Sequence, residues 1–193
     1  SDQPQNIAFA VNLMSGACTA LAATFVAWTT IAFARLSMVG RDQALNLEQT
    51  IVTCGAGLAA GLATAFCTSI WFSAVEGEVY ALSSFFTAVV FWAMLKWEHN
   101  VTEEEEQGIK GHFTKADRWI ILIFYLMGLS IGVHLLNLLT IPAIVMIYYF
   151  KRYKVTKWGS FFAFIIGCLI TGLVQKAVIV WSIKGAGNLD ILF

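Results

Sequence analysis

The stretch from Trp119 to Phe150, WIILIFYLMGLSIGVHLLNLLTIPAIVMIYYF, decides the fold because its length fits neither one ordinary membrane crossing nor two. A spanning helix needs roughly 20 apolar residues. As one helix the run is too long, and as a pair of helices it is short. The basic residues of the neighbouring loops distinguish these two alternatives.

Of the twelve lysine and arginine residues, ten fall in three loops between apolar runs, namely Arg35 and Arg41; Lys96, Lys110, Lys115 and Arg118; and Lys151, Arg152, Lys154 and Lys157. Cytoplasmic loops of membrane proteins collect such residues. A single crossing would put the second and third loops on opposite faces, whereas a hairpin puts all three on one face. We therefore predict a short helical hairpin at 119–150, with helices over 119–133 and 138–150. It would turn near Gly132–Asn137, and each helix would span about 20 Å.

The whole chain is typical of an all-α, polytopic helical membrane protein. It is 59% hydrophobic and 12% charged, whereas soluble domains are about 25% charged. The other expected crossings are Ile7–Phe33, Ile51–Phe72, Val79–Trp97 and Trp158–Ile183. With the hairpin they make about six transmembrane helices in a single transmembrane domain, 1–193. Residues 98–118, which include EEEE at 103–106, are expected to form a solvated cytoplasmic loop.

Charge and cysteine content exclude some functions and leave others open. The net charge is zero, so bulk charge indicates no nucleic-acid partner. The four cysteines, Cys18, Cys54, Cys67 and Cys168, lie in apolar runs without CxxC or metal-ligand spacing. We interpret them as small core residues, expect no metal ligands among them, and find no cofactor indicated. A requirement for a divalent metal ion stays open.

The stretch WFSAVEGEVYAL, residues 71–82, places two carboxylates between apolar runs on the face opposite the basic loops. Ionisable groups cost roughly 2.5–3.5 kcal/mol at a membrane helix centre and less near the interface, so those retained are functional candidates. Ser73 and Glu76 match a capping box, which gives Glu76 a structural alternative. Capping does not require Glu78. The two acids could converge on one ligand only if the chain at Gly77 is not helical.

Five further polar residues are candidates for binding a substrate. Asn12, Tyr80, His134 and Asn137 lie at the same outer ends of the expected helices, and Lys176 interrupts the last apolar run. His134 could be satisfied by backbone carbonyls, or it could contact a phosphate or relay a proton. Tyr80 could belong to an interfacial aromatic belt or stack on a sugar. Lys176 could snorkel to the interface or hold an anionic headgroup.

Three stretches carry a resemblance to a known family: NIAFAVNLMSGACTALAATFVAW (6–28), WFSAVEGEVYALSSFFTAVVFWAMLKWE (71–98) and YLMGLSIGVHLLNLLTIPAI (125–144). They resemble large bacterial membrane proteins that are similar to GT-C glycosyltransferases, in particular the protein O-mannosyltransferases. The resemblance implies a GT-C-like core that transfers a sugar, with mannose expected, from a polyprenyl-phosphate donor to a protein hydroxyl. It places the site on the periplasmic side of a bacterial inner membrane, among membrane lipid, with Glu78 and Glu76 as supporting catalytic residues and His134 as a substrate contact.

One departure from the family concerns the principal catalytic acid. Family members begin with an earlier helix and an external loop with an acidic motif of the DCGE type, and the sequence starting at Ser1 contains neither. We therefore expect a fragment of a larger protein that is inactive alone, with the principal acid upstream. Two other functions stay open. The short helices around Pro142 would suit a transporter or flippase-like protein, and a non-catalytic scaffold in a membrane assembly is the third alternative.

Overall fold

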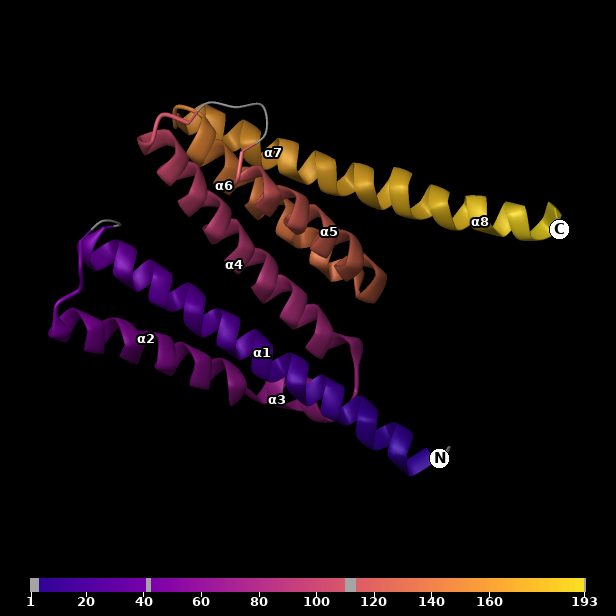
Figure 1. The fold of residues 1–193 in the computed structure, drawn as a ribbon. Coiled ribbons are helices and arrows are strands. Elements are labelled where there is room, and N and C mark those ends of the chain that lie inside the picture. Colours follow the sequence, from indigo (N-terminus) through magenta and orange to yellow (C-terminus); the bar gives the residue numbers. More distant parts are fainter. Residues whose placement is uncertain (1–3, 41–42, 110–113, 193) are drawn as a thin grey trace. The chain divides into compact units, whose positions relative to one another are not determined.

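The computed structural model describes residues 4–40, 43–109 and 114–192, which are helical apart from short turns (Figure 1). The all-α prediction is confirmed. The chain divides into two compact units, residues 1–135 and 136–193. Two of the loop cations used above, Arg41 and Lys110, lie outside the described residues.

Five helices make up the first unit, and the second unit is also helical. The first contains α1 (Pro4–Val39), α2 (Leu47–Ala65), α3 (Thr68–Val75), α4 (Val79–Glu106) and α5 (Asp117–Val133). A 3-10 turn, η1 (Leu135–Leu139), follows α5. The second contains α6 (Thr140–Arg152), α7 (Lys157–Leu173), the π-helical η2 (Val174–Ile179) and α8 (Val180–Leu192).

Among the described residues, three continuous helices are long and apolar enough to cross a membrane. They are α1, α4 and the helix over Lys157–Gly185. The pair α2 and α3 passes the same test only together, across a bend of 58°. With 17 and 13 residues, α5 and α6 are about 26 and 20 Å long. The prediction of two short helices is therefore confirmed, and the break falls at His134, as expected.

The expected helix over residues 51–72 is wrong, because it breaks between α2 and α3. Cys67 adopts an extended conformation, with φ −63° and ψ 131°. Just before the break the Thr64 hydroxyl donates to the carbonyl of Ala60 at 2.8 Å, an interaction that bends helices. The rings of Phe66 and Trp71 stack across the break with their centroids 6.0 Å apart. The bend is thus stabilised locally without a proline or a glycine.

The expected loop at residues 98–118 is helical in its first part, because α4 continues to Glu106. Val101 and Glu104 are buried there. The Glu104 carboxylate accepts a hydrogen bond of 3.0 Å from the amide of Ala116, directly before α5. The description of EEEE as solvated is therefore wrong for Glu104, whose carboxylate satisfies a backbone donor at the start of the next helix.

Small residues let α1 and α2 pack closely in antiparallel directions. A Cβ atom at Gly57 would lie 3.1 Å from the carbonyl oxygen of Ala27 and would overlap the Ile31 side chain, and one at Gly61 would lie 3.1 Å from the Ala27 Cβ. Gly57 and Gly61 form a GxxxG pattern, which is typical of closely packed membrane helices, and these contacts agree with it. Leu58, beside Gly57 in the sequence, is 64% exposed, which suits a lipid-facing surface.

α1 runs parallel to α4, and aromatic rings join the two helices. Phe25 contacts both Phe85 and Trp92, with centroids 6.0 and 5.3 Å away. Trp28 stacks on Trp92 at 6.0 Å. Because residue numbers rise together along both helices, their N-terminal ends meet at one end of the unit. On its buried side α4 carries a helical stripe of fully buried residues, Val90, Ala93, Met94, Trp97 and Val101.

Replacing Gly57 by leucine tests the α1–α2 contact. We expect Gly57→Leu to lower the free energy of unfolding by about 1–3 kcal/mol, because the new side chain overpacks the contact with α1. Gly55→Leu is the matched control, since nothing lies within 4 Å of its added Cβ. It should leave stability unchanged or raise it by up to about 1 kcal/mol through helix propensity. Equal effects in a detergent unfolding titration would contradict the packing.

Candidate functional site

The chain turns sharply between α3 and α4 at Glu76–Glu78. Glu76 ends α3 in a right-handed helical conformation, and Glu78 precedes α4 in an extended one, with φ −91° and ψ 166°. Between them Gly77 has φ +65°, a left-handed conformation that glycine adopts without steric cost. The two acids are therefore not on one helix. Because the chain at Gly77 is not helical, their side chains could converge on a single ligand.

The capping box predicted for Ser73 and Glu76 is wrong. Ser73 lies inside α3, where its hydroxyl donates to the carbonyl of Ser69 at 3.0 Å. The reason is that α3 runs on to Val75, so Ser73 sits in its last turns and not at the start of α4. Glu76 therefore loses the structural role that competed with a functional one.

A capping box that the sequence reading missed begins α2. The amide of Gln49 donates to Asn46 Oδ1 at 2.8 Å, and the amide of Asn46 donates to Gln49 Oε1 at 3.0 Å. The signal was present as Asn-x-x-Gln ahead of the apolar run. Its first residue, Asn46, lies five residues before the expected helix start at Ile51.

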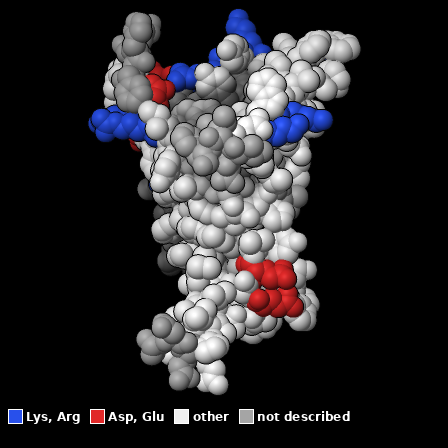
Figure 2. Space-filling view, turned by 90° about the vertical axis from the view of Figure 1, so that its right-hand side faces the viewer, with Lys and Arg blue, Asp and Glu red and all other residues white. Residues whose placement is uncertain are grey.

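Both carboxylates of the turn are exposed to solvent. Neither the Glu76 nor the Glu78 side chain has a hydrogen bond or an ion pair with any described residue, and Glu78 makes no side-chain cap to α4. In the lower part of Figure 2 an acidic patch stands among uncharged side chains. Two carboxylates held in this way can accept hydrogen bonds from hydroxyl groups of an incoming molecule.

Asn12 on α1 lies against the turn. A Cβ atom at Gly77 would be 3.0 Å from Asn12 Oδ1 and 2.9 Å from Val11 Cγ1. The first turns of α1 therefore pack directly on the backbone between the two acids. The amide of Asn12 adds a neutral donor and acceptor beside the carboxylates.

Tyr80, in the first turn of α4, contacts His134 at the end of α5. The two ring centroids are 5.2 Å apart, with the planes at 47°. Tyr80 is 47% exposed, and His134 ends α5 with an extended backbone, φ −156° and ψ 128°. A partly exposed aromatic pair beside two acids offers both a stacking surface and hydrogen-bonding groups.

Five of the seven predicted site residues thus come together in the first unit. We call them the Gly77 cluster: Asn12, Glu76, Glu78, Tyr80 and His134. The other two belong to the second unit, and their participation stays a prediction. Asn137 is buried, and its carbonyl accepts a 2.7 Å hydrogen bond from the Thr140 hydroxyl. Lys176 is exposed within the π-helical η2, an irregularity often found at functional sites.

Two hydroxyls on α1 were missed by the sequence reading. Ser15 and Thr19 are 1% and 6% exposed, and their hydroxyl oxygens have no hydrogen-bond partner among the described residues. They follow Asn12 by three and seven residues, which puts all three on one face of the helix. This helical spacing of polar residues could have been recognised in the sequence. The described residues contain no group of three or more His, Cys, Asp or Glu side chains that could hold a metal ion.

One comparison with known proteins identifies the family. The model of the protein O-mannosyl-transferase TMEM260 N-terminal domain matches residues 1–157. The chain belongs to this family. The matched range includes every residue of the Gly77 cluster, together with Asn137, and ends before Lys176. No curated protein and no solved structure matches the chain.

Replacing Gly77 by alanine tests whether the turn packs on α1. A left-handed alanine costs about 1–2 kcal/mol by itself, and we expect about 1–3 kcal/mol more from the contact with Val11 and Asn12. Gly108→Ala is the matched control, because Gly108 has φ +68° but nothing within 4 Å of its added Cβ. It should show only the backbone cost. Equal losses of stability for the two variants would show that α1 does not press on the turn.

Proposed function

We propose that this chain forms the membrane core of a glycosyltransferase that moves a sugar from a polyprenyl-phosphate donor to a protein hydroxyl. The expected sugar is mannose, in keeping with the family of protein O-mannosyl-transferases to which the chain belongs. The proposal includes a GT-C-like arrangement of helices. It also includes a bacterial inner membrane, with the basic loops in the cytoplasm and the Gly77 cluster on the periplasmic side.

The observation that carries the proposal is the turn at Gly77. It holds two exposed carboxylates, whose side chains have no described partner, directly before the start of α4. Charged groups at such a position are expensive near a membrane and are retained for function. With the capping box absent, no described contact gives Glu76 or Glu78 a structural task.

Glu78, supported by Glu76, would orient the hydroxyl groups of the sugar or of the acceptor. Carboxylates fixed in advance toward the reacting groups stabilise a transition state without reorganising when the reaction occurs. Tyr80 and His134 would contact the sugar face or the donor phosphate, and Asn12 would complete the hydrogen bonding. Sugar transfer also needs a principal base, and we assign that role to none of these five residues.

Asn137 and Lys176 of the second unit stay candidates for binding a substrate, as the sequence alone predicts. A lysine in an apolar helix can hold an anionic headgroup, because its ammonium and a phosphate attract strongly where water is scarce. The π-helical backbone at Val174–Ile179 would then serve to aim Lys176. The proposal for these two residues rests on their chemistry and on the sequence alone.

A transporter is the second candidate, favoured by one observation. The span formed by α2 and α3 is broken by 58°, and transporters form substrate sites at broken helices. Membership of a transferase family weighs against this function. Uptake of a substrate into proteoliposomes, without transfer of any sugar, would favour the transporter.

Replacing Glu78 by glutamine tests the proposed role. In the full-length protein we expect Glu78→Gln to lower kcat/KM by about 10- to 100-fold, the loss of one hydrogen bond to a charged group. The measurement is transfer of labelled mannose from a polyprenyl-phosphate donor to an acceptor peptide. Glu106→Gln, at the far end of α4, is the matched control and should keep full activity.

Two outcomes of this assay would be informative in different ways. Transfer by Glu78→Gln within twofold of the unaltered protein would remove Glu78 from the site. Absence of transfer by the unaltered protein with every polyprenyl-phosphate sugar tested would contradict the donor class itself.

A further inference from the structure

One face of α1, near the end that packs on the Gly77 turn, carries Asn12, Ser15, Gly16 and Thr19. At 3.6 residues per helical turn these four positions share an arc of about 100°. α1 lies between α2 and α3 on one side and α4 on the other (Figure 1). Because Ser15 and Thr19 are buried, this face belongs to the interior of the first unit and not to its lipid-facing surface.

The two hydroxyls on this face are buried without a partner. Ser15 and Thr19 are 1% and 6% exposed, and neither hydroxyl oxygen bonds to any described residue. On the same helix, the hydroxyls of Thr24 and Thr30 donate to the backbone carbonyls four residues earlier, at 2.8 and 2.9 Å. The Ser15 and Thr19 hydroxyls are therefore not satisfied by their own backbone. A buried hydroxyl without a hydrogen bond destabilises a protein, so both require a partner.

Gly16 leaves open space beside these hydroxyls. A Cβ atom at Gly16 would have nothing within 4 Å, although the glycine is half-buried. Further along α1 the packing closes, since Ala22 and Ala23 are 3% and 7% exposed and a Cβ atom at Gly61 would lie 3.4 Å from the carbonyl oxygen of Ala23. The space is thus closed toward the middle of α1. At its other end it is bordered by Asn12, which is exposed.

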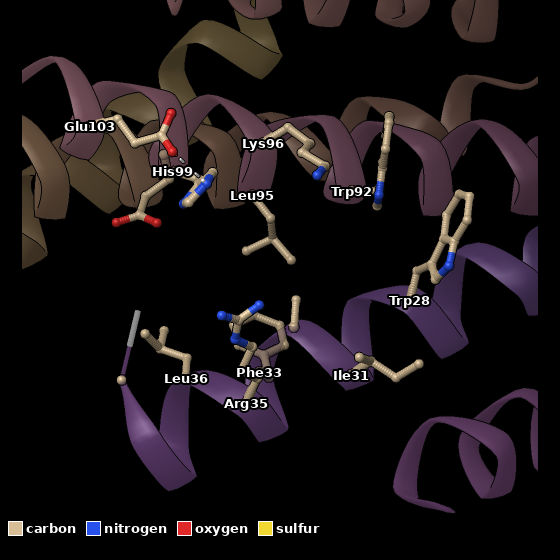
Figure 3. A pocket seen from close by; sticks show the side chains of 13 residues that line it. Trp28, Ile31, Phe33, Arg35, Leu36, Trp92, Leu95, Lys96, His99 and Glu103 are labelled. Carbon is tan, nitrogen blue, oxygen red and sulfur yellow. Dashed lines mark ion pairs between the residues drawn. The ribbon is translucent and has the colours of Figure 1, made fainter. Parts of the chain in front are cut away.

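A cavity of about 590 Å³ at the other end of the α1–α4 contact has no such need for a ligand. Its charged side chains are shown in Figure 3, where Glu103 pairs with His99 at 3.2 Å. The Lys96 ammonium lies 5.8 Å from the centre of the Trp92 ring. These groups are partnered within the chain. The unmet hydrogen-bonding capacity between the two helices is therefore at Ser15 and Thr19.

We propose that the space at Gly16 is a pocket for ordered water, held by Asn12, Ser15 and Thr19. Side chains four residues apart on a helix have Cβ atoms about 5–6 Å apart. One water that bonds to two hydroxyls at about 2.8 Å each spans the same distance. The Asn12 carboxamide supplies a third polar partner, and a buried water makes about three hydrogen bonds. Water is favoured over a larger ligand because Ser15 and Thr19 are almost inaccessible from the surface.

The ordered water would support the turn at Gly77 through Asn12. A Cβ atom at Gly77 would lie 3.0 Å from Asn12 Oδ1, so the carboxamide that packs on the turn also borders the pocket. Hydrogen bonds from the water would hold this carboxamide in one orientation beside Glu76 and Glu78. The inference does not depend on the proposed transferase activity, because its tests measure stability and the position of water.

Removing each hydroxyl tests the proposal through the direction of the change in stability. We expect Ser15→Ala and Thr19→Val each to lower the melting temperature of the full chain in detergent by about 2–4 °C, because the water loses one of its partners. A hydroxyl that bonds to nothing would instead give a rise when it is removed. Thr30→Val is the matched control, since its hydroxyl bonds to a backbone carbonyl, and it should leave the melting temperature unchanged.

Filling the pocket with a methyl group gives a second measurement. Alanine in place of a helical glycine ordinarily raises stability. Gly55→Ala should raise the melting temperature by about 2–4 °C, because nothing lies within 4 Å of its added Cβ. Gly16→Ala has equally open surroundings, yet we expect no rise, since its methyl group displaces the water and leaves the two hydroxyls without a partner. Equal rises for the two variants would contradict the proposal.

An experimental structure of the full chain that resolves ordered water decides the question even where a variant does not fold. The proposal predicts a water within about 2.7–3.2 Å of both Ser15 Oγ and Thr19 Oγ1. A pocket that is empty, or that holds a lipid or detergent chain, would overturn it. An unchanged or raised melting temperature for both Ser15→Ala and Thr19→Val would overturn it as well.

Discussion

The backbone of Gly77 presses against the first turns of α1, and this contact governs how the first unit is arranged. A side chain at this position would meet Val11 and Asn12, and the φ of +65° favours glycine for a second reason. The turn directs the chain from α3 into α4 parallel to α1. The same register then brings Phe25 to Phe85 and Trp28 to Trp92. One tight turn thus fixes both the position of the acids and the aromatic packing between the helices.

No charged residue lies on α4 before Lys96, and the spacing from Glu78 to Lys96 matches a bilayer. Glu78 precedes the helix, and the next charged residue is Lys96. Eighteen residues of helix span about 27 Å, close to the roughly 30 Å of a hydrocarbon core. The Gly77 cluster and the opposite end of α4 would therefore face opposite headgroup layers.

Much of the fold could be predicted because apolar runs and loop charges are read directly from sequence. The two short helices on either side of His134 followed from charge alone. The bend at Cys67 could not be predicted, since neither proline nor glycine marks it. Glu104 was also unpredictable, because its partner, the amide of Ala116, is brought near only by the packing of α4 on α5. The capping-box alternative for Glu76 was wrong, because the four-residue pattern from Ser73 to Glu76 does not reveal where the preceding helix ends.

Cysteine labelling beside the Gly77 cluster tests the central claim most directly. Leu13, Val79 and Leu135 neighbour the cluster and are exposed, so each can carry a single cysteine in a full-length protein without its native cysteines. The account predicts labelling by an impermeant maleimide from the outer side, slowed by a polyprenyl-phosphate mannose donor at all three positions. A cysteine at Lys115 should react only from the cytoplasmic side and without protection. Labelling of the three positions from the cytoplasmic side, or without any protection by the donor, would contradict the account.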